Sequence, residues 1–199
     1  MKISDFVPNI MLGSDAEDAV SILTADHDKV KDLFSQFEEI KDLTDEHGLK
    51  ERQRIVAEAC RELTIHTAVE DEIFYPAVRA AIKDDDLMNE AKVEHEGAKT
   101  LIGQIEKMKP ADEMLTAKFT VLSEYVKHHI KEEQAEMFPK ARKSDLDLHA
   151  LGVKMLARKH ELMGEKPAPK SRAIKKRASP HGKAGDKSGH GRDVAAAKT

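Results

Sequence analysis

HTAVEDEIFYP, from His66 to Pro76, and HIKEEQAEMFP, from His129 to Pro139, share one pattern: a histidine, a glutamate four residues later and a proline ten residues later. Residues four apart lie on the same face of an α-helix, one turn above each other. Each segment therefore presents an imidazole and a carboxylate side by side. The repetition of this pattern predicts that the chain contains two related halves.

A lone histidine precedes each of these pairs. His27 lies 39 residues before His66, and His95 lies 34 residues before His129. The loop between two helices absorbs a difference of this size at little cost in free energy. The sequence therefore predicts two helical hairpins that face each other across a pseudo-twofold centre.

Apolar residues recur every three or four positions around these motifs, which is the period of one helical face. This period predicts an all-α fold, an antiparallel up-down four-helix bundle with a short fifth helix. The predicted helices span roughly residues 15–43, 49–82, 86–108, 112–142 and 145–163. Ser144 is the expected cap of the fifth helix, which we expect to pack on the outside of the bundle.

Each of the four long helices carries polar side chains in the middle of its apolar stripe. In the second helix, for example, the stripe runs through His66 and Glu70 and continues with Ile73 and Ala77. Polar groups on apolar stripes point into the core of a bundle. The candidate metal ligands defined in this way are His27, His66, Glu70, His95, His129 and Glu133.

The chemistry of these side chains points to metal. Burying a carboxylate without a partner costs several kcal/mol, and no Lys or Arg falls on the stripes that hold Glu70 and Glu133. A metal ion satisfies both carboxylates, while neutral imidazoles supply further lone pairs. Six ligands are more than one tetrahedral zinc ion uses. We therefore expect two metal ions.

The composition narrows the class of protein. The 199 residues contain 35% charged and 4% aromatic residues and no tryptophan, which suits a helical domain with a solvated surface.

The lone cysteine, Cys60, and the absence of a leader-like pattern after Met1 favour a cytoplasmic protein. No apolar window approaches the ~18 residues that span a bilayer. Because no nucleophile or phosphate-loop motif is present, any enzymatic activity would come from the metals.

The charge changes sign near Gly164. Residues 165–199 contain ten Lys or Arg and three Asp or Glu, which leaves residues 1–163 with 23 basic and 34 acidic residues. The net charges are −11 for the first part and +7 for the second. We therefore predict a bundle domain over residues 1–163 and a basic, disordered tail over residues 164–199. Nucleic acid is the partner that such a tail would attract.

The pattern His27, His66-x-x-x-Glu70, His95, His129-x-x-x-Glu133 resembles the hemerythrin-like HHE cation-binding domain family. The resemblance covers about residues 18–160 and includes the phrases IFYP and EMFP and the segment DLDLHALGVKMLARKHEL. It implies a non-haem di-iron centre, with two iron ions joined by an oxo or hydroxo bridge. It also implies that this centre meets oxygen, peroxide or nitric oxide.

The sequence departs from the oxygen-carrying hemerythrins, whose third helix offers two histidines and whose fourth offers a histidine with an aspartate five residues later. Here Lys99 follows His95 by four residues, and Glu133 follows His129 by four. Two six-coordinate irons have twelve positions, of which four histidines fill four, two bridging carboxylates four and the oxo or hydroxo bridge two. Two positions stay open, whereas a fifth histidine would leave one. This difference favours redox chemistry or sensing over reversible oxygen carriage. Tyr125, one turn before His129, is a candidate further ligand as a phenolate.

Three functions stay open at this point. The chain is a di-iron protein that senses or turns over oxygen, peroxide or nitric oxide, an iron-binding sensor or store without turnover, or a nucleic-acid-associated protein acting through its tail. The remaining histidines of residues 1–163 are expected at the surface: His47, His128, His149 and His160. Acidic residues beside the ligands are also expected on solvated faces, some of them orienting a histidine: Asp26, Asp28, Glu72, Glu94, Glu96 and Glu132.

Overall fold

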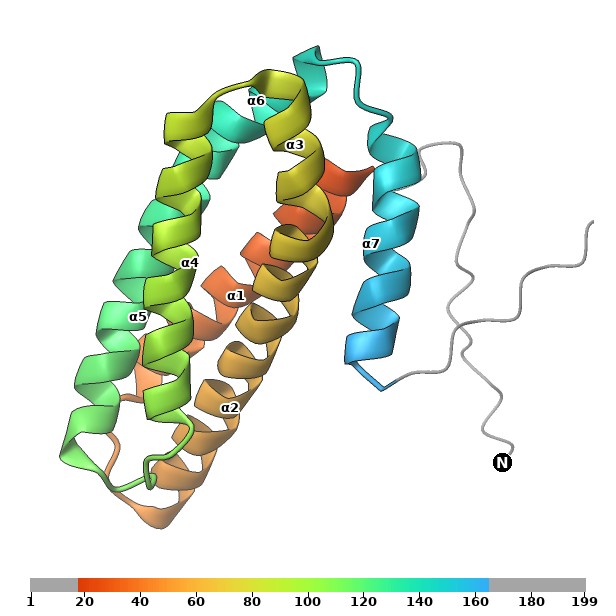
Figure 1. Ribbon diagram of the computed structural model, residues 1–199. Coiled ribbons are helices and arrows are strands. Elements are labelled where there is room, and N and C mark those ends of the chain that lie inside the picture. Colours follow the sequence, from red (N-terminus) through yellow and green to blue (C-terminus); the bar gives the residue numbers. More distant parts are fainter. Residues whose placement is uncertain (1–17, 165–199) are drawn as a thin grey trace, which may run out of the picture. The chain divides into compact units, whose positions relative to one another are not determined.

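The structure is a computed structural model and describes residues 18–164, in which every regular element is helical. Four long helical rods form the bundle, each antiparallel to the next along the chain: α1, α2 continued by η1 and α3, α4, and α5 continued by η2 and α6 (Figure 1). A shorter helix, α7, lies outside them. The elements are α1 (Ala19–Ile40), α2 (Glu46–Val69), η1 (Glu70–Phe74), α3 (Tyr75–Ile82), α4 (Asp85–Ile105), α5 (Glu113–Glu132), η2 (Glu133–Met137), α6 (Phe138–Lys143) and α7 (Leu148–Leu162). The predicted all-α, up-down bundle is confirmed. Residues 15–17 of the first predicted helix and the predicted tail from residue 165 onward lie outside the described residues.

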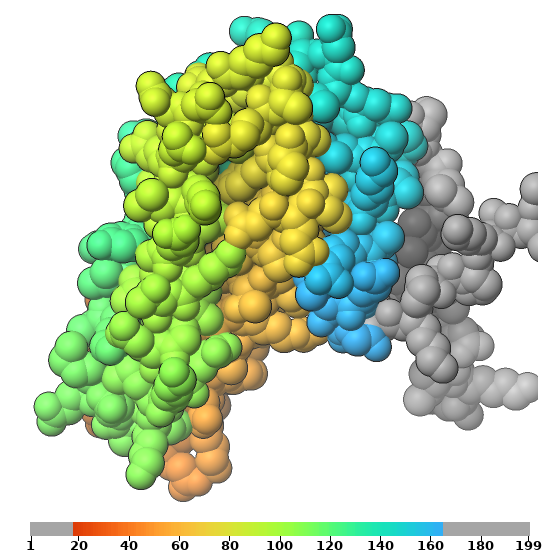
Figure 2. Space-filling view, viewed as in Figure 1, coloured from red at the N-terminus to blue at the C-terminus, as the bar shows by residue number. Residues whose placement is uncertain are grey.

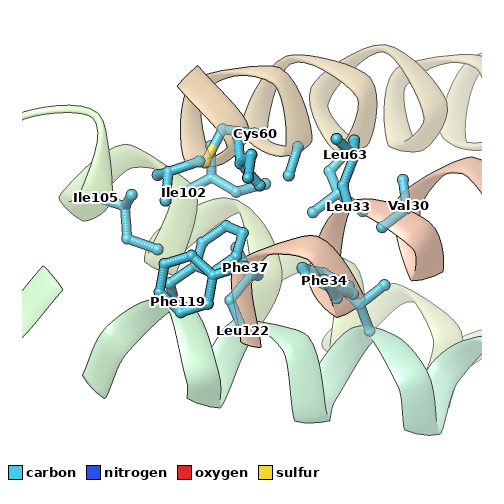
Figure 3. Close-up of a cluster of buried hydrophobic side chains, with 14 of the residues drawn as sticks. Val30, Leu33, Phe34, Phe37, Cys60, Leu63, Ile102, Ile105, Phe119 and Leu122 are labelled. Atoms are coloured by element: carbon cyan, nitrogen blue, oxygen red, sulfur yellow. The ribbon is translucent and has the colours of Figure 1, made fainter. Parts of the chain in front are cut away.

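The hydrophobic core consists of two clusters with a polar layer between them. One cluster centres on the rings of Phe34, Phe37 and Phe119 (Figure 3), where the centroids of Phe37 and Phe119 are 4.5 Å apart. The other contains Phe74 and Phe138, with ring centroids 5.9 Å apart. Along each rod the candidate histidine lies between residues of the two clusters, so the apolar layers seal the polar layer from both ends.

An aspartate cap begins each of the helices α1, α2, α4, α5 and α7. The Asp18 carboxylate accepts a hydrogen bond from the Ser21 backbone N–H at 2.8 Å, and Asp84 caps α4 in the same way. A carboxylate at this position satisfies a free N–H group and opposes the positive end of the helix dipole. The predicted Ser144 cap of the fifth helix is wrong, because Asp147 caps α7 instead. The Ser144 hydroxyl donates to the Ala141 carbonyl at the end of α6.

Two π-helical turns interrupt the long rods, η1 at Glu70 and η2 at Glu133. In η1 the Tyr75 N–H donates to the carbonyl of Glu70, five residues earlier, and Phe138 does the same to Glu133 in η2. A proline follows each of these turns. Its ring would clash with the carbonyl four residues before it in a regular α-helix, and a wider turn relieves the clash.

The π turn moves the buried face by one residue. Ile73 and Ala77, expected on the stripe, are only partly buried. Phe74 and Val78 are fully buried in their place. The extra residue in the turn rotates every later side chain of the rod relative to the α-helical register. The predicted stripe is therefore wrong after Glu70.

Helix α7 packs on the outside of the bundle against α1, α2 and η1, as predicted. Figure 2 shows its surface in contact with that of α2. Within α7, the side chain of Met155 is fully buried and that of Leu151 is nearly so. No helix among residues 18–164 combines the length and the apolar character needed to cross a membrane.

Candidate metal centre

The four predicted histidines meet in the polar layer. The Nε2 atoms of His27 and His66 are 3.2 Å apart, and those of His95 and His129 are 3.1 Å apart. All four side chains are buried. Each pair joins one lone histidine to one histidine of the repeated motif, so the two halves of the site match the two halves of the sequence.

Both predicted glutamates reach histidines of both pairs. Glu70 Oε2 lies 3.1 Å from His66 Nε2 and 3.3 Å from His95 Nε2. Glu133 Oε2 lies 3.2 Å from His27 Nε2 and 3.5 Å from His129 Nε2. Two groups of possible metal ligands result, His27, His66, Glu70 and Glu133 in one and Glu70, His95 and His129 in the other. Glu70 belongs to both groups.

The glutamate oxygens have unmet bonding capacity. Glu70 is completely buried, and neither of its carboxylate oxygens accepts a hydrogen bond. Oε2 of Glu133 is in the same position. Among residues 18–164, these three are the buried side-chain oxygens without a hydrogen-bond partner. Because an unpaired buried carboxylate costs several kcal/mol, the arrangement fits a positively charged guest that these oxygens would bind.

Acidic side chains outside the cluster orient the imidazoles. His95 Nδ1 donates to Asp71 Oδ1 at 2.9 Å, and His129 Nδ1 donates to Glu94 Oε2 at 2.7 Å. A proton on Nδ1 leaves the Nε2 lone pair directed into the cluster. Two lone pairs facing each other about 3 Å apart repel, and a cation between them removes the repulsion. The donor set and its orientation are therefore compatible with metal binding.

Of the acidic residues expected near the ligands, Asp26 and Glu94 face a candidate ligand histidine. Asp26 Oδ2 lies 3.5 Å from His66 Nδ1. Asp71 was missed, although it directly follows Glu70. In the sequence it looks like one more solvated charge, and only the fold brings it to His95.

The charged side chains of the cluster also shift one another's pKa values. Burial opposes a charge on His66, yet Glu70 and Asp26 outweigh this effect and raise the pKa of His66 to about 10. Burial likewise opposes a charge on His95, and Asp71 and Glu70 raise its pKa to about 9. Burial favours a neutral Glu70, but His66 and His95 hold its pKa well below the usual range. A metal ion bound here would therefore compete with protons for the same atoms.

The phenol in the cluster belongs to Tyr75, not to the predicted candidate Tyr125. The Tyr75 hydroxyl donates to Glu133 Oε1 at 2.9 Å and lies 3.1 Å from His95 Nε2. Burial and the charge of Glu133 raise its pKa well above the usual value, so the phenol keeps its proton. The Tyr125 side chain is 53% exposed and stands beside Gly97 of α4. The sequence offered one signal for Tyr75, its place in the phrase IFYP.

The other histidines among residues 18–164 lie at the surface, as predicted. His47, His128, His149 and His160 are exposed. Cys60 is buried in the core, as expected for a small apolar side chain. Burial, together with the charge of Glu106, raises the pKa of its thiol to about 12. A thiol with this pKa is a poor nucleophile and metal ligand.

A small cavity of about 20 Å³ opens beside the histidines. Apolar side chains from all four rods line it together with the four imidazoles: Val30, Leu63, Ala98, Val126 and Ile130. This volume holds about one water-sized molecule. The cluster therefore borders a space for a very small guest.

Comparison with known proteins agrees with this geometry. The model of the hemerythrin HHE cation binding domain matches residues 18–141. A crystal structure of a hemerythrin HHE cation binding domain-containing protein from Mycobacterium kansasii has a similar fold, with a TM-score of 0.58 and 24% identity. The similarity covers 74% of this chain and 88% of that one.

A curated relative, named a DNA nickase, from Nostoc sp. (strain PCC 7120 / SAG 25.82 / UTEX 2576), is 26% identical over 132 residues. The match covers 65% of this chain and 36% of the relative, so the chain spans about a third of that protein. The family model, in contrast, spans more than half of this chain and contains both repeated motifs. The protein therefore belongs to the hemerythrin HHE cation-binding domain family.

Proposed function

We propose that this protein binds two iron ions, joined by an oxo or hydroxo bridge, and uses them to sense or react with oxygen, peroxide or nitric oxide. The ligands in this proposal are His27, His66, Glu70, His95, His129 and Glu133. The iron ions would supply electron transfer to or from the small molecule. The residues of the chain hold the ions, orient the imidazoles and exclude bulk water.

The placement of the two glutamates carries the proposal. Each lies close to one histidine of each pair, and three of their four oxygens have no hydrogen-bond partner. Carboxylates in such a position suit a bridge between two cations, because each carboxylate has an oxygen for each ion. One ion would use only part of this donor set.

The donor types favour iron. Imidazoles and carboxylates without a thiolate suit iron and manganese, and a single zinc site would use four ligands in a tetrahedron. The only cysteine, Cys60, is buried in the apolar core rather than in the polar layer. Six nitrogen- and oxygen-donating side chains, one of them the shared carboxylate of Glu70, therefore support a pair of six-coordinate ions.

The cavity supports a very small guest. Its volume of about 20 Å³ holds about one water-sized molecule, and its lining combines apolar side chains such as Leu63 and Val126 with the imidazoles and Glu94. This size suits oxygen, nitric oxide or peroxide rather than an organic substrate. The Tyr75 hydroxyl, held by Glu133, places one proton next to the cluster.

Metal content per chain together with the optical spectrum of the aerobic protein tests the proposal. We expect two iron ions and the near-ultraviolet bands of an oxo bridge. One zinc ion and a featureless spectrum would refute it. In the Glu70→Gln variant, which keeps the shape of the side chain, iron should fall well below two per chain because one bridge is lost. His149→Ala changes an exposed histidine and should leave the iron content unchanged.

Turnover separates the alternative functions. Consumption of peroxide or nitric oxide by the iron-loaded protein would identify an enzyme, and its absence would favour a sensor. A store without turnover should lose much of its helix content and melting temperature when iron is chelated. Each of these functions is consistent with the cytoplasmic location we expect.

Action on nucleic acid is the weaker candidate. It rests on the +7 charge of residues 165–199 and on the name of the Nostoc relative. The net charge of −11 on residues 1–163 opposes it, because this part of the chain repels phosphate.

A further inference from the structure

A second group of possible metal ligands lies on the surface, just outside the buried cluster. It consists of Glu94 on α4 and of His128 and Glu132 on α5. One nitrogen or oxygen atom from each residue lies within 4.8 Å of the other two. His128 and Glu132 are one helical turn apart, the same spacing as in the two buried motifs.

The three side chains converge from two rods. His128 Nε2 lies 3.2 Å from Glu132 Oε1 and 3.7 Å from Glu94 Oε1. The His128 side chain is 61% exposed, while those of Glu94 and Glu132 are 20% and 32% exposed. One imidazole and two carboxylates in a solvent-accessible position are a common donor set for a divalent first-row metal ion, with water in the remaining positions.

No fixed cation neutralises the two carboxylates. In the part of the chain that the structure describes, the ion pairs of Glu94 and Glu132 are with histidines, and none is with Lys or Arg. Many other surface carboxylates here have such a partner, for example Glu72 with Arg158. The surrounding domain also carries a net charge of −11, which concentrates cations near its surface.

Glu94 connects this surface group to the buried cluster. Its Oε2 accepts the hydrogen bond from His129 Nδ1 at 2.7 Å, while its Oε1 faces His128. Glu94 also lines the small cavity beside the histidines, together with Tyr125. Within residues 18–164, Glu94 is therefore the carboxylate that contacts both a buried candidate ligand, His129, and an exposed imidazole, that of His128.

We propose that Glu94, His128 and Glu132 form a weak surface site for a divalent transition-metal ion, and that ions bound there enter the buried centre. The loading role rests on the proposed function, whereas the surface site does not. Glu94 serves both sites, and it would keep the incoming ion next to His129 while its water ligands are exchanged. An exposed site with three protein ligands binds less tightly than a buried one, which suits release inward.

The binding part is tested with Mn²⁺ added to the iron-loaded protein, because Mn²⁺ is stable in air and its free form is counted by electron paramagnetic resonance. We expect one weak site per chain in the unaltered protein. In the double variant His128→Ala/Glu132→Gln its affinity should fall at least tenfold. Neither residue belongs to the buried cluster, so the bound iron should stay the same.

The matched control is His149→Ala/Glu124→Gln, which removes the same kinds of side chain from exposed positions outside the group. It should keep the Mn²⁺ site. No weak site in the unaltered protein, or equal Mn²⁺ binding by both double variants, would overturn the surface site. In that case His128 and its glutamates form an ordinary ion-pair cluster.

The loading part is tested by adding limiting Fe²⁺ without oxygen to the metal-free protein. The His128→Ala/Glu132→Gln variant should load several-fold more slowly than the control variant, yet reach the same final iron content. Equal loading rates would overturn the entry role. If no chain retains iron after a wash with chelator, the buried centre itself fails, and the Mn²⁺ titration still decides the surface site.

Discussion

Lys159 of α7 forms an ion pair with Asp26 of α1, and the second oxygen of Asp26 lies 3.5 Å from Nδ1 of His66. Both side chains are largely buried, with 14% and 13% of their surface exposed. The other half of the site repeats this relationship, because Lys99 pairs with Asp71, which accepts from His95. A lysine thus fixes the carboxylate that faces a histidine in each half. Through Lys159, the outer helix α7 is connected to the candidate metal centre.

The Lys159→Met variant should weaken metal binding by about 10–100-fold, because Asp26 loses the charge that positions it beside His66. It should also lower the melting temperature, since a mostly buried carboxylate is left unpaired. Metal affinity and thermal unfolding measure both effects. Arg158→Gln is the matched control, because Arg158 lies on the same helix but pairs with the more exposed Glu72. Equal metal affinity in the two variants would show that Lys159 only anchors α7.

The Tyr75→Phe variant should keep the fold and the iron but change the optical spectrum of the centre. The ring stays in the core, so the change in unfolding free energy should be about 1 kcal/mol, the value of one hydrogen bond. Glu133 Oε1 loses its donor, which alters its strength as a ligand. Tyr125→Phe is the control and should leave the spectrum unchanged. A spectral change in the Tyr125 variant alone would restore Tyr125 as the phenol of the site.

Helical periodicity alone does not predict that Tyr75 points into the cluster. Five residues separate it from Glu70, and in a regular α-helix this spacing turns a side chain about 140° away. The π turn η1 adds a residue to that turn and returns Tyr75 to the inner face. The proline of the repeated motif is the sequence feature connected with this turn. The 3.6-residue period of an α-helix does not predict the turn.

The six residues predicted as ligands lie before or at the π turns, where the regular period still holds. His27, His66, Glu70, His95, His129 and Glu133 are therefore found together as the stripes indicated. The outer carboxylates were harder to predict, because Asp71, Asp26 and Glu94 lie off the stripes. Their contacts depend on how the rods are rotated against one another, and one helix by itself does not define that rotation. Their roles as ligands and orienting groups stay predictions until metal is measured.

Asp18, the cap of α1, should make the free energy of unfolding depend on pH. Burial alone would raise its pKa, but the Ser21 N–H and Arg142 outweigh this effect and lower it from 3.8. The folded state therefore favours the charged form, so the stabilisation is present above about pH 4 and is lost as the pH falls through the lowered pKa. Asp18→Asn should cost about 0.5–1 kcal/mol at pH 7 and less at pH 3.

Urea unfolding of the metal-free chain at both pH values measures this difference without a contribution from metal release. Asp145→Asn serves as the control, because Asp145 is exposed and caps no helix. Its effect should be small at both pH values. A cost of Asp18→Asn that is the same at pH 3 and pH 7 would contradict the assigned role of the charge.

A chain truncated after Gly164 should keep its helix content, its iron and its optical spectrum. Residues 165–199 contain almost no large apolar side chains, so ordering them would not be repaid by burial, and they supply none of the proposed ligands. If their +7 charge recruits a polyanion, the full-length protein should bind DNA with an affinity that falls steeply with added salt. The truncated form should not bind, because the remaining −11 charge repels phosphate. Equal DNA binding by both forms would exclude this role, and loss of iron on truncation would show that the division of the chain at Gly164 is wrong.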